Sequence, residues 1–511
     1  MSMETFPAPQ RVHELLAPWL ARQPEAPALR DAFVTLRYGE LDAQAAQAAR
    51  QLQDAGVRAG DRVLLVGENC VALCVLFLAL SRLDAWTVVV NARLSAREID
   101  QFLAHSGARR ALYLRHVSAD ARDHAARHGA TPFASTLGDL AIGPLTEAAM
   151  PEPCHADPRQ QVAALVYTSG TTGAPKGVML THANLAFVAE AARDIRGLGP
   201  GDVLYGVLPM AHVVGLSTQF LGAMCAGAEL LLEPQFSPEG AVRALRSEGV
   251  TVFTGVPALY ARILEWTRQR GEALNAPALR LISVAGSPLT PPLKAAVEQG
   301  FGLDLQNGYG LTETAPTVAQ TRQEAPRTDC SVGPALAQVE VRIVDAARRE
   351  VAAGEVGELW VRSPGVMRGY YRSPELTAAV LDADGWFNTG DMARMAADGA
   401  LFITGRSKEL IIRSGFNVYP LEIEQVLNAY PGIVQSAVVG REAGHNEEVV
   451  AFLETRQGMV IDEPQLRAYL RAQLSPYKQP SEIRLMAALP CAPNGKVLKN
   501  VLKALATSPA P

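Results

Sequence analysis

Short apolar runs that alternate with helical stretches constrain the fold of this 511-residue chain more than any other feature. The runs lie at residues 62–66, 86–90, 161–167, 203–208, 250–254 and 279–284. Each is followed by turn residues and then by a stretch of helical character. Strands alternating with helices of this length predict βαβ units and a parallel sheet, so the chain is expected to be of the α/β class. Residues 37–58 and 71–80 are expected to be helices, the second one buried.

The pattern changes near residue 332, and the chain is too long for one core. Apolar alternation at 339–344, 357–361 and 401–403, with glycine-rich turns between, predicts a smaller antiparallel sheet or barrel. A boundary is expected near Gly405 and Arg406. The predicted domains are therefore residues 1–405 and 406–511, the second with its own strand–helix pattern.

Composition excludes several classes of protein. A net charge of −5 without a clustered basic surface argues against a nucleic-acid partner. Six scattered cysteines form no disulfide framework and favour a reducing cytoplasm. The most apolar stretch, Val71 to Leu80, is shorter than the roughly 20 residues that span a bilayer, and the first 16 residues lack the apolar core of a signal peptide. A cytoplasmic enzyme without a transmembrane segment is expected.

The strongest motif is Tyr167-Thr-Ser-Gly-Thr-Thr-Gly-Ala-Pro-Lys-Gly177, which directly follows an apolar strand. Its glycines allow the backbone to wrap closely around an anion, its hydroxyls donate, and Lys176 adds a mobile positive charge. A polyphosphate is the natural ligand. The loop is not a Walker A motif, because Pro175 precedes Lys176. The alternative interpretation is a flexible surface turn.

A second motif, Asn307-Gly-Tyr-Gly-Leu-Thr-Glu-Thr314, lacks the third glycine of a dinucleotide fingerprint. Tyr309 offers a flat face to a purine. Thr312 and Glu313 offer oxygen atoms suited to Mg²⁺, which bridges phosphates. Taken alone, the octapeptide could equally be a turn at the end of a strand.

Two further segments carry single residues of interest. Asp391, at the end of Trp386-Phe-Asn-Thr-Gly-Asp391, is placed to grip both hydroxyls of a ribose, although an Asx-turn in a hairpin explains it as well. Lys496, in Pro493-Asn-Gly-Lys496, could be no more than a solvated tip.

Together these four segments resemble the adenylate-forming superfamily of acyl-CoA synthetases, adenylation domains and luciferases, from about Val12 to Leu502. Leu208 to His212 and Ala285 to Leu289 extend the resemblance. It implies a large N-terminal domain of two parallel-sheet αβαβα layers plus a small β-barrel, with a smaller α+β C-terminal domain. It also implies an ATP-dependent acid–CoA ligase, which joins a carboxylate to AMP with release of pyrophosphate and then passes the acyl group to coenzyme A.

The resemblance assigns roles by position. Thr312, Glu313, Lys176 and Lys496 would be catalytic, Glu313 and Thr168 would hold Mg²⁺, and Lys408 would be the hinge between the domains. The triphosphate loop would be Thr168, Ser169, Gly170, Thr171, Thr172, Gly173 and Lys176, and the remaining ATP contacts Gly286, Ser287, Asn307, Gly308, Tyr309, Gly310, Thr312, Asp391, Arg406 and Lys496. The acid pocket would be lined by His212, Val213, Val214, Leu216, Thr218, Phe220, Val256, Val284, Gly286 and Gly308, and coenzyme A would meet Arg413, Ser414 and Gly415.

The pocket positions are mostly apolar and often small, without an arginine or lysine to receive a second carboxylate. A monocarboxylate with a medium-chain, alicyclic or aryl group is therefore expected. Ile412 stands where several members of the superfamily carry a lysine, so this chain lacks that side chain for the thioester step. Two other functions stay open: loading of a carrier-protein thiol, and a silent nucleotide-binding regulator. A homodimer is one assembly compatible with the sequence.

Overall fold

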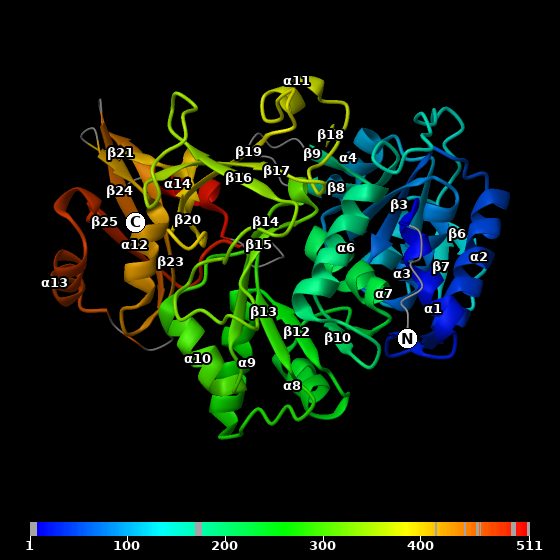
Figure 1. The fold of residues 1–511 in the computed structure, drawn as a ribbon, viewed down its shortest axis with the longest axis horizontal. Helices are drawn as coiled ribbons and strands as arrows, with labels where there is room; N and C mark the ends of the chain where they lie inside the picture. The colour runs from blue at the N-terminus through cyan, green and yellow to red at the C-terminus, as the bar shows by residue number, and fades with distance from the viewer. Residues whose placement is uncertain are drawn as a thin grey trace.

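The computed structural model describes residues 8–168, 176–413, 416–443, 446–455, 459, 461–491 and 497–507. The first sheet and its helices lie at one end of the molecule and the C-terminal domain at the other (Figure 1). The second sheet and a smaller antiparallel sheet lie between them. None of the helices in these described ranges is long and apolar enough to cross a membrane.

The first eight-stranded sheet is parallel in its centre, where β8, β4, β3 and β5 are neighbours, and antiparallel at both edges. Its strands in spatial order are β18 (Gly369–Tyr370), β9 (Lys176–Thr181), β8 (Val162–Thr168), β4 (Trp86–Asn91), β3 (Arg62–Gly67), β5 (Arg110–Leu114), β7 (Leu140–Ile142) and β6 (Thr131–Phe133). The run at 161–167 is followed along the chain by strand β9 before helix α6 (His182–Arg196), so the expected strand–helix succession is wrong at this point.

The second eight-stranded sheet is parallel from β14 to β1, with an antiparallel strand at each edge. Its strands in spatial order are β15 (Thr317–Gln320), β14 (Leu305–Gly310), β13 (Leu281–Val284), β12 (Val252–Gly255), β10 (Val203–Gly206), β11 (Glu229–Leu232), β1 (Pro27–Arg30) and β2 (Thr35–Arg37). The two sheets confirm the predicted layers.

Helices pack against both sheets. Among them, α3 (Val71–Arg82) is buried along nearly its whole length, and its side chains belong to one core with residues of both sheets, including Leu65 and Leu230. A helix covered by protein on all sides can be apolar all round, as this one is. The other helices of this region are η1 (Val12–Leu16), α1 (Ala17–Arg22), α2 (Tyr38–Asp54), α4 (Ala96–Ser106), α5 (Ala119–Arg127), η2 (Val214–Leu221, a π-helix), α7 (Gly222–Ala226), α8 (Pro238–Ser247), α9 (Pro257–Arg270), α10 (Pro291–Phe301) and η3 (Thr312–Thr314).

The predicted small sheet or barrel corresponds to a four-stranded antiparallel sheet with β16 (Glu340–Val344), β17 (Val356–Arg362), β19 (Phe387–Met395) and β20 (Leu401–Arg406), beside α11 (Pro374–Ala378). Beyond it, η4 (Ser407–Glu409) leads to the hairpin of β21 (Ile411–Arg413) and β22 (Phe416–Val418).

The C-terminal domain is built on a three-stranded sheet, with side chains of alternate residues entering separate cores on its two faces. Val438 and Ala451 belong to one core, whereas Val439 and Val450 belong to the other. A domain with its own cores is able to move as a unit. Its elements are α12 (Pro420–Asn428), β23 (Ile433–Ala443), β24 (Asn446–Thr455), α13 (Glu463–Gln473), η5 (Pro476–Lys478), β25 (Glu482–Met486) and α14 (Lys499–Thr507).

Asn69, in the turn after β3, joins the first sheet to the second. Its side-chain nitrogen donates to the carbonyls of Gly206 and Leu208, each at 2.9 Å, and its oxygen accepts from the Met210 amide at 2.9 Å. The side chain is only 3% exposed. Because buried polar groups without partners are costly, these bonds fix the ends of two strands from different sheets together.

We expect Asn69→Ala to lower the free energy of unfolding by about 3 kcal/mol, because three buried main-chain groups lose their partner. Thermal unfolding of the purified protein measures the change. Gln53→Ala, at an exposed position of α2, is the control and should leave the melting temperature unchanged. Equal melting of the two variants would contradict this role of Asn69.

Candidate active site

The motif residues gather where parallel strands end. Thr168 is the last residue of β8, Gly286 and Ser287 follow β13, and β14 ends at Gly310. In open α/β sheets, ligands bind outside the carboxyl ends of the strands. The fold therefore places Thr168, at the start of the predicted phosphate loop, and the segment from Asn307 to Gly310 at the carboxyl ends of parallel strands, where ligands bind.

Tyr370 contacts both Lys176 and Glu313. The sequence alone did not identify Tyr370 as a site residue. Thr168 and Lys176 are register partners on β8 and β9, and the Lys176 ammonium lies 5.4 Å from the centre of the Tyr370 ring. The Tyr370 hydroxyl donates to the Glu313 carboxylate at 2.8 Å. Burial and the negative charge of Glu313 raise the pKa of Tyr370. A cation, a phenol and a carboxylate from separate segments thus form one cluster.

A second polar cluster centres on Asp391, which is 4% exposed. The Tyr309 hydroxyl donates to one oxygen of its carboxylate at 2.6 Å, and the Arg406 guanidinium lies 3.0 Å from the other. Asp391 and Arg406 face each other across β19 and β20. Thr389, also missed from the sequence, accepts a hydrogen bond from the Asp391 amide at 3.0 Å.

Burial and the charges of this cluster act on the pKa values of its members. Burial, followed by the charge of Asp391, raises the pKa of Tyr309 well above 10. Burial acts to lower the pKa of Arg406, but Asp391 and Glu409 outweigh it and the pKa is raised. The tyrosine hydroxyl is therefore held neutral and fixed, and the residue as a whole is half-buried.

The turn after β14 depends on a glycine. A Cβ at Gly310 would lie 1.8 Å from the Pro316 carbonyl oxygen, so no other residue fits there. Leu311 donates its amide to the same carbonyl at 3.1 Å. The Ser217 hydroxyl of η2 donates to the Ala315 carbonyl at 2.7 Å. The predicted acid-pocket helix and the turn that carries Thr312 and Glu313 are thus in direct contact.

The residues predicted to contact adenine differ in their exposure and in their hydrogen bonds within the protein. Gly286, at φ +83°, and Ser287 are exposed. Asn307 is 4% exposed, and its side-chain nitrogen donates to the carbonyls of Cys330 and Ser331 at 3.1 Å each. Asn307 therefore holds the β14 strand in place and keeps only its amide oxygen for a ligand.

The acid-pocket residues fall into two groups. His212 is exposed, Val214 and Val256 are half-buried, and Val256 contacts the position that a Cβ on Gly286 would take, at 3.6 Å. Buried members are Val213, Leu216, Thr218, Phe220 and Val284. Leu216 and Phe220 have no exposed surface, and Phe220 packs edge-on against Phe77, which gives these two a role in the core. The Thr218 hydroxyl is buried without a partner in the described part of the chain.

Several predicted residues lie outside the described residues: Ser169, Gly170, Thr171, Thr172, Gly173, Ser414, Gly415 and Lys496. Of the described ones in the same segments, Lys408 is exposed within η4. Arg413 donates to the carbonyls of Tyr477 and Gln479, at 3.2 and 2.6 Å. Its guanidinium thus joins the hairpin to the segment around η5.

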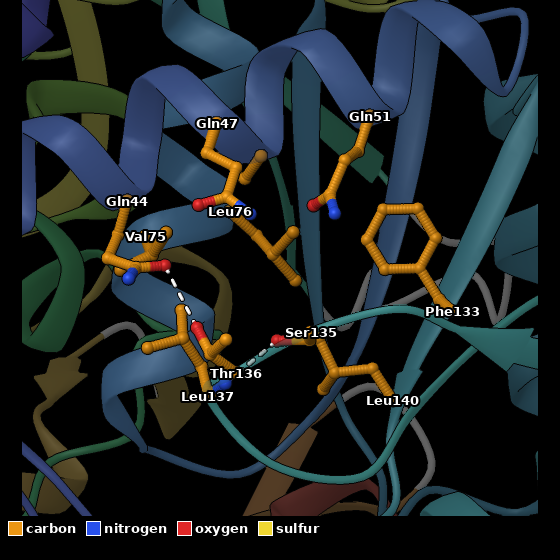
Figure 2. Close-up of a pocket in the computed structure, with 11 residues that line it drawn as sticks. Gln44, Gln47, Gln51, Val75, Leu76, Phe133, Ser135, Thr136, Leu137 and Leu140 are labelled. Atoms are coloured by element: carbon orange, nitrogen blue, oxygen red, sulfur yellow. Dashed lines mark hydrogen bonds between the residues drawn. The ribbon is translucent and has the colours of Figure 1, made fainter.

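Two other features were tested as sites. Within the described ranges, no group of three or more His, Cys, Asp or Glu side chains could hold a metal. A small pocket between α2, α3 and the segment 133–140 is lined by glutamines, Ser135, Thr136 and apolar side chains (Figure 2). Gln44 accepts from the Thr136 hydroxyl at 3.1 Å. The pocket shares no residue with the clusters above and has no titratable lining side chain, so it offers no chemistry.

Comparison with known proteins agrees with this geometry. Residues 16–371 match the model of the AMP-binding enzyme family, and residues 422–496 match that of the AMP-binding enzyme C-terminal domain. The chain is 35% identical to a feruloyl-CoA synthase of Amycolatopsis sp., over 96% of this chain and 98% of that protein. It is 33% identical to a 2-succinylbenzoate–CoA ligase of Geobacillus kaustophilus, over 95% and 97%.

Among solved structures, ATP-bound MatB from Rhodopseudomonas palustris superposes with a TM-score of 0.84 at 31% identity, covering 96% of this chain and 98% of that one. Of the reactions left open by the sequence, the relatives support acyl transfer to coenzyme A through an adenylate. The chain belongs to the AMP-binding enzyme family, and it is an AMP-forming acid–CoA ligase that uses ATP and coenzyme A.

Proposed function

We propose that this ligase activates a monocarboxylic acid that carries an aromatic ring. The names of the two relatives above both describe aromatic acids, and 2-succinylbenzoate also has a second carboxylate. A second carboxylate buried here would need a cation. The pocket candidates include no lysine or arginine. These observations favour one carboxylate.

The single observation that carries the aromatic proposal is that the packing of the protein does not require a glycine at Gly308. A Cβ at this position would meet nothing closer than 3.6 Å, and its backbone is outside the left-handed region. Neither packing nor backbone conformation therefore requires glycine at Gly308, in contrast to Gly310. A glycine that the protein itself does not need leaves a flat surface for a ligand.

For the nucleotide, we propose that the Tyr309 ring stacks on adenine, because its hydroxyl is anchored and the residue is only half-buried. Asp391 and Arg406 would hold the ribose, and Thr312 would face the α-phosphate. Lys176 and the loop 168–173 would bind the outer phosphates. The Thr312 hydroxyl has no hydrogen-bond partner among the described residues, which leaves it free for this contact.

Mg²⁺ fits the site as part of the ATP complex. Mg²⁺ is usually bound by one or two carboxylates together with substrate phosphates. Glu313 supplies one carboxylate, of which one oxygen accepts from Tyr370, and Thr168 ends strand β8 of the first sheet. When bound, the ion would neutralise phosphate charge; Glu313 would position it and Tyr370 would orient Glu313.

Charge is the main obstacle to the first half-reaction, because carboxylate and ATP are both anions. One ammonium about 4 Å from a phosphate oxygen contributes on the order of 4 kcal/mol at an effective dielectric of about 20. We propose that Lys496 supplies this charge at the α-phosphate, while Lys176 and the loop amides neutralise the leaving pyrophosphate. Fixed donors of this kind are typically the largest contribution to such catalysis.

The second half-reaction needs a different arrangement. We propose that the C-terminal domain begins at Arg406 and turns about Lys408, so that Lys496 leaves the site and the face around Arg413, Ser414 and Gly415 meets coenzyme A. Lys408 is exposed in a short 3-10 helix, which supports a pivot there. One site then serves two reactions in turn.

A cytoplasmic location is proposed on cysteine chemistry. All six cysteines are unpaired, and three of them are buried. Thiols persist in this form where the compartment is reducing.

A screen of CoA-dependent AMP formation across aromatic and aliphatic acids tests the substrate proposal. We expect the highest kcat/KM with a monocarboxylate that carries an aromatic ring. A clear preference for straight-chain or dicarboxylic acids would overturn it.

We expect Gly308→Ala to lower kcat/KM for the best aromatic acid by about 10- to 200-fold, because an added methyl group enters the acid site. The melting temperature should stay unchanged. Gly199→Ala is the control, since its Cβ would meet nothing within 4 Å and it lies away from the site. If both variants kept wild-type kinetics, Gly308 would not line the acid site.

Lys496→Ala should slow adenylate formation by about 10²- to 10³-fold, as loss of one fixed donor to the transition state does. Thioester formation from supplied acyl-AMP should stay near the wild-type rate. Pyrophosphate exchange and single-turnover thioester assays separate the two steps, with Lys503→Ala as control. An equal loss in both half-reactions would refute this role.

A further inference from the structure

The segment that contains the proposed pivot is anchored on its N-terminal side. Arg406 pairs with Asp391 at 3.0 Å, and the Ser407 hydroxyl donates to the Gly390 carbonyl at 3.1 Å. Both partners belong to β19 of the four-stranded sheet. The chain is therefore tied to the large domain up to Ser407.

On the C-terminal side, Glu409 is tied to the last helix. The Lys499 ammonium lies 2.6 Å from the Glu409 carboxylate and 2.8 Å from that of Glu424. Glu424 also accepts from the Val438 amide at 2.8 Å, so α12 and β23 share it. Lys499 thus connects the residue after the pivot to the body of the small domain. Lys408 is the one residue between the two sets of contacts, and its side chain has no ion pair with the described residues.

Lys499 is not placed where a lysine stabilises a helix. It is the first residue of α14, and positive charge is unfavourable at the N-terminal end of a helix dipole. Burial also acts to lower its pKa, yet Glu424 and Glu409 outweigh burial and raise it. The two carboxylates, rather than the helix, account for a cation at this point.

The same residue follows the proposed catalytic lysine closely. Leu498 donates its amide to the Pro490 carbonyl at 2.8 Å, and Val497 bridges Cys491. Lys496 precedes Val497 in the sequence. Movement of Lys499 relative to Glu409 would therefore be passed along three residues to Lys496.

We propose that Lys499 is a positioning residue, which clamps Glu409 to α14 and α12, confines the domain rotation to Lys408, and so sets the place that Lys496 reaches. The inference rests on the proposed roles of Lys408 and Lys496. A purely structural role for Lys499 would instead predict lower stability without a specific loss of turnover.

Lys499→Met tests the clamp. We expect kcat for pyrophosphate exchange to fall by about 10- to 100-fold, because small misplacements far from the chemistry cost this much. The KM for ATP should change less than about threefold. The variant misplaces Lys496 without removing a proposed ATP contact, so it should affect kcat rather than ATP binding. Lys499→Arg should restore kcat, and Lys503→Met, one turn along α14 and exposed, should behave as wild type.

Glu409→Gln should reproduce the loss, and the double variant with Lys499→Met should be no slower than either single one, because both remove one interaction. Hydrogen exchange of residues 407–413 should speed up in both variants. Unchanged kcat in Lys499→Met, multiplied losses in the double variant, or unchanged hydrogen exchange would each overturn the proposal.

Failure of the proposed function is recognised separately. If wild-type protein exchanged no pyrophosphate with the aromatic acids, the substrate proposal would fail. The hydrogen exchange of residues 407–413 would still decide whether Lys499 holds Glu409.

Discussion

The buried carboxylate of Asp391 is the point on which the site depends. A charge buried to 4% exposure must be paired, and Tyr309 and Arg406 supply the pairing at 2.6 and 3.0 Å. Tyr309 belongs to the second parallel sheet, whereas Asp391 and Arg406 lie on the neighbouring strands β19 and β20 of the four-stranded sheet. One anion thus joins these two sheets at the place where we propose that the nucleotide sugar lies.

A second junction works in the same way for the first sheet. Tyr370 pairs with β9 through the main chain, contacts Lys176 with its ring and donates its hydroxyl to Glu313. The phosphate loop and the turn after β14 come from different sheets, and neither sheet alone could place both groups. Asn69 fixes the two sheets to each other, so the geometry of the site follows from the packing of the layers.

Much of this could be predicted from the sequence where local pattern decides structure. The continuous apolar stretch of α3 and the short apolar runs that form β3, β4 and β13 are local signals. The elements predicted from them lie at nearly the residues that the structure gives. Tyr309, Asp391 and Arg406 were named from motifs, and the structure brings these three together. The spacing of the motifs alone could not show that these separate segments form one site. The resemblance to a family supplied that inference.

The rest depends on contacts between distant parts of the chain. Strand β9 was missed because its short run continues a glycine-rich motif, and its pairing with β18 joins residues nearly 200 positions apart. Tyr370 and Lys499 stand in no motif that suggests chemistry; only tertiary contacts give them partners. Asn307 shows the opposite case, since its motif suggested a ligand contact and its amide nitrogen is used within the protein.

The most direct test of the Asp391 junction is a calorimetric titration of AMP into wild-type protein and Asp391→Asn, with the exposed Asp384→Asn as control. If Asp391 holds the ribose, the variant should bind AMP about 10- to 100-fold more weakly, as expected when a charged hydrogen-bond acceptor is lost. The control should match wild type. Equal affinity of all three proteins for AMP would contradict the placement of the nucleotide at this carboxylate.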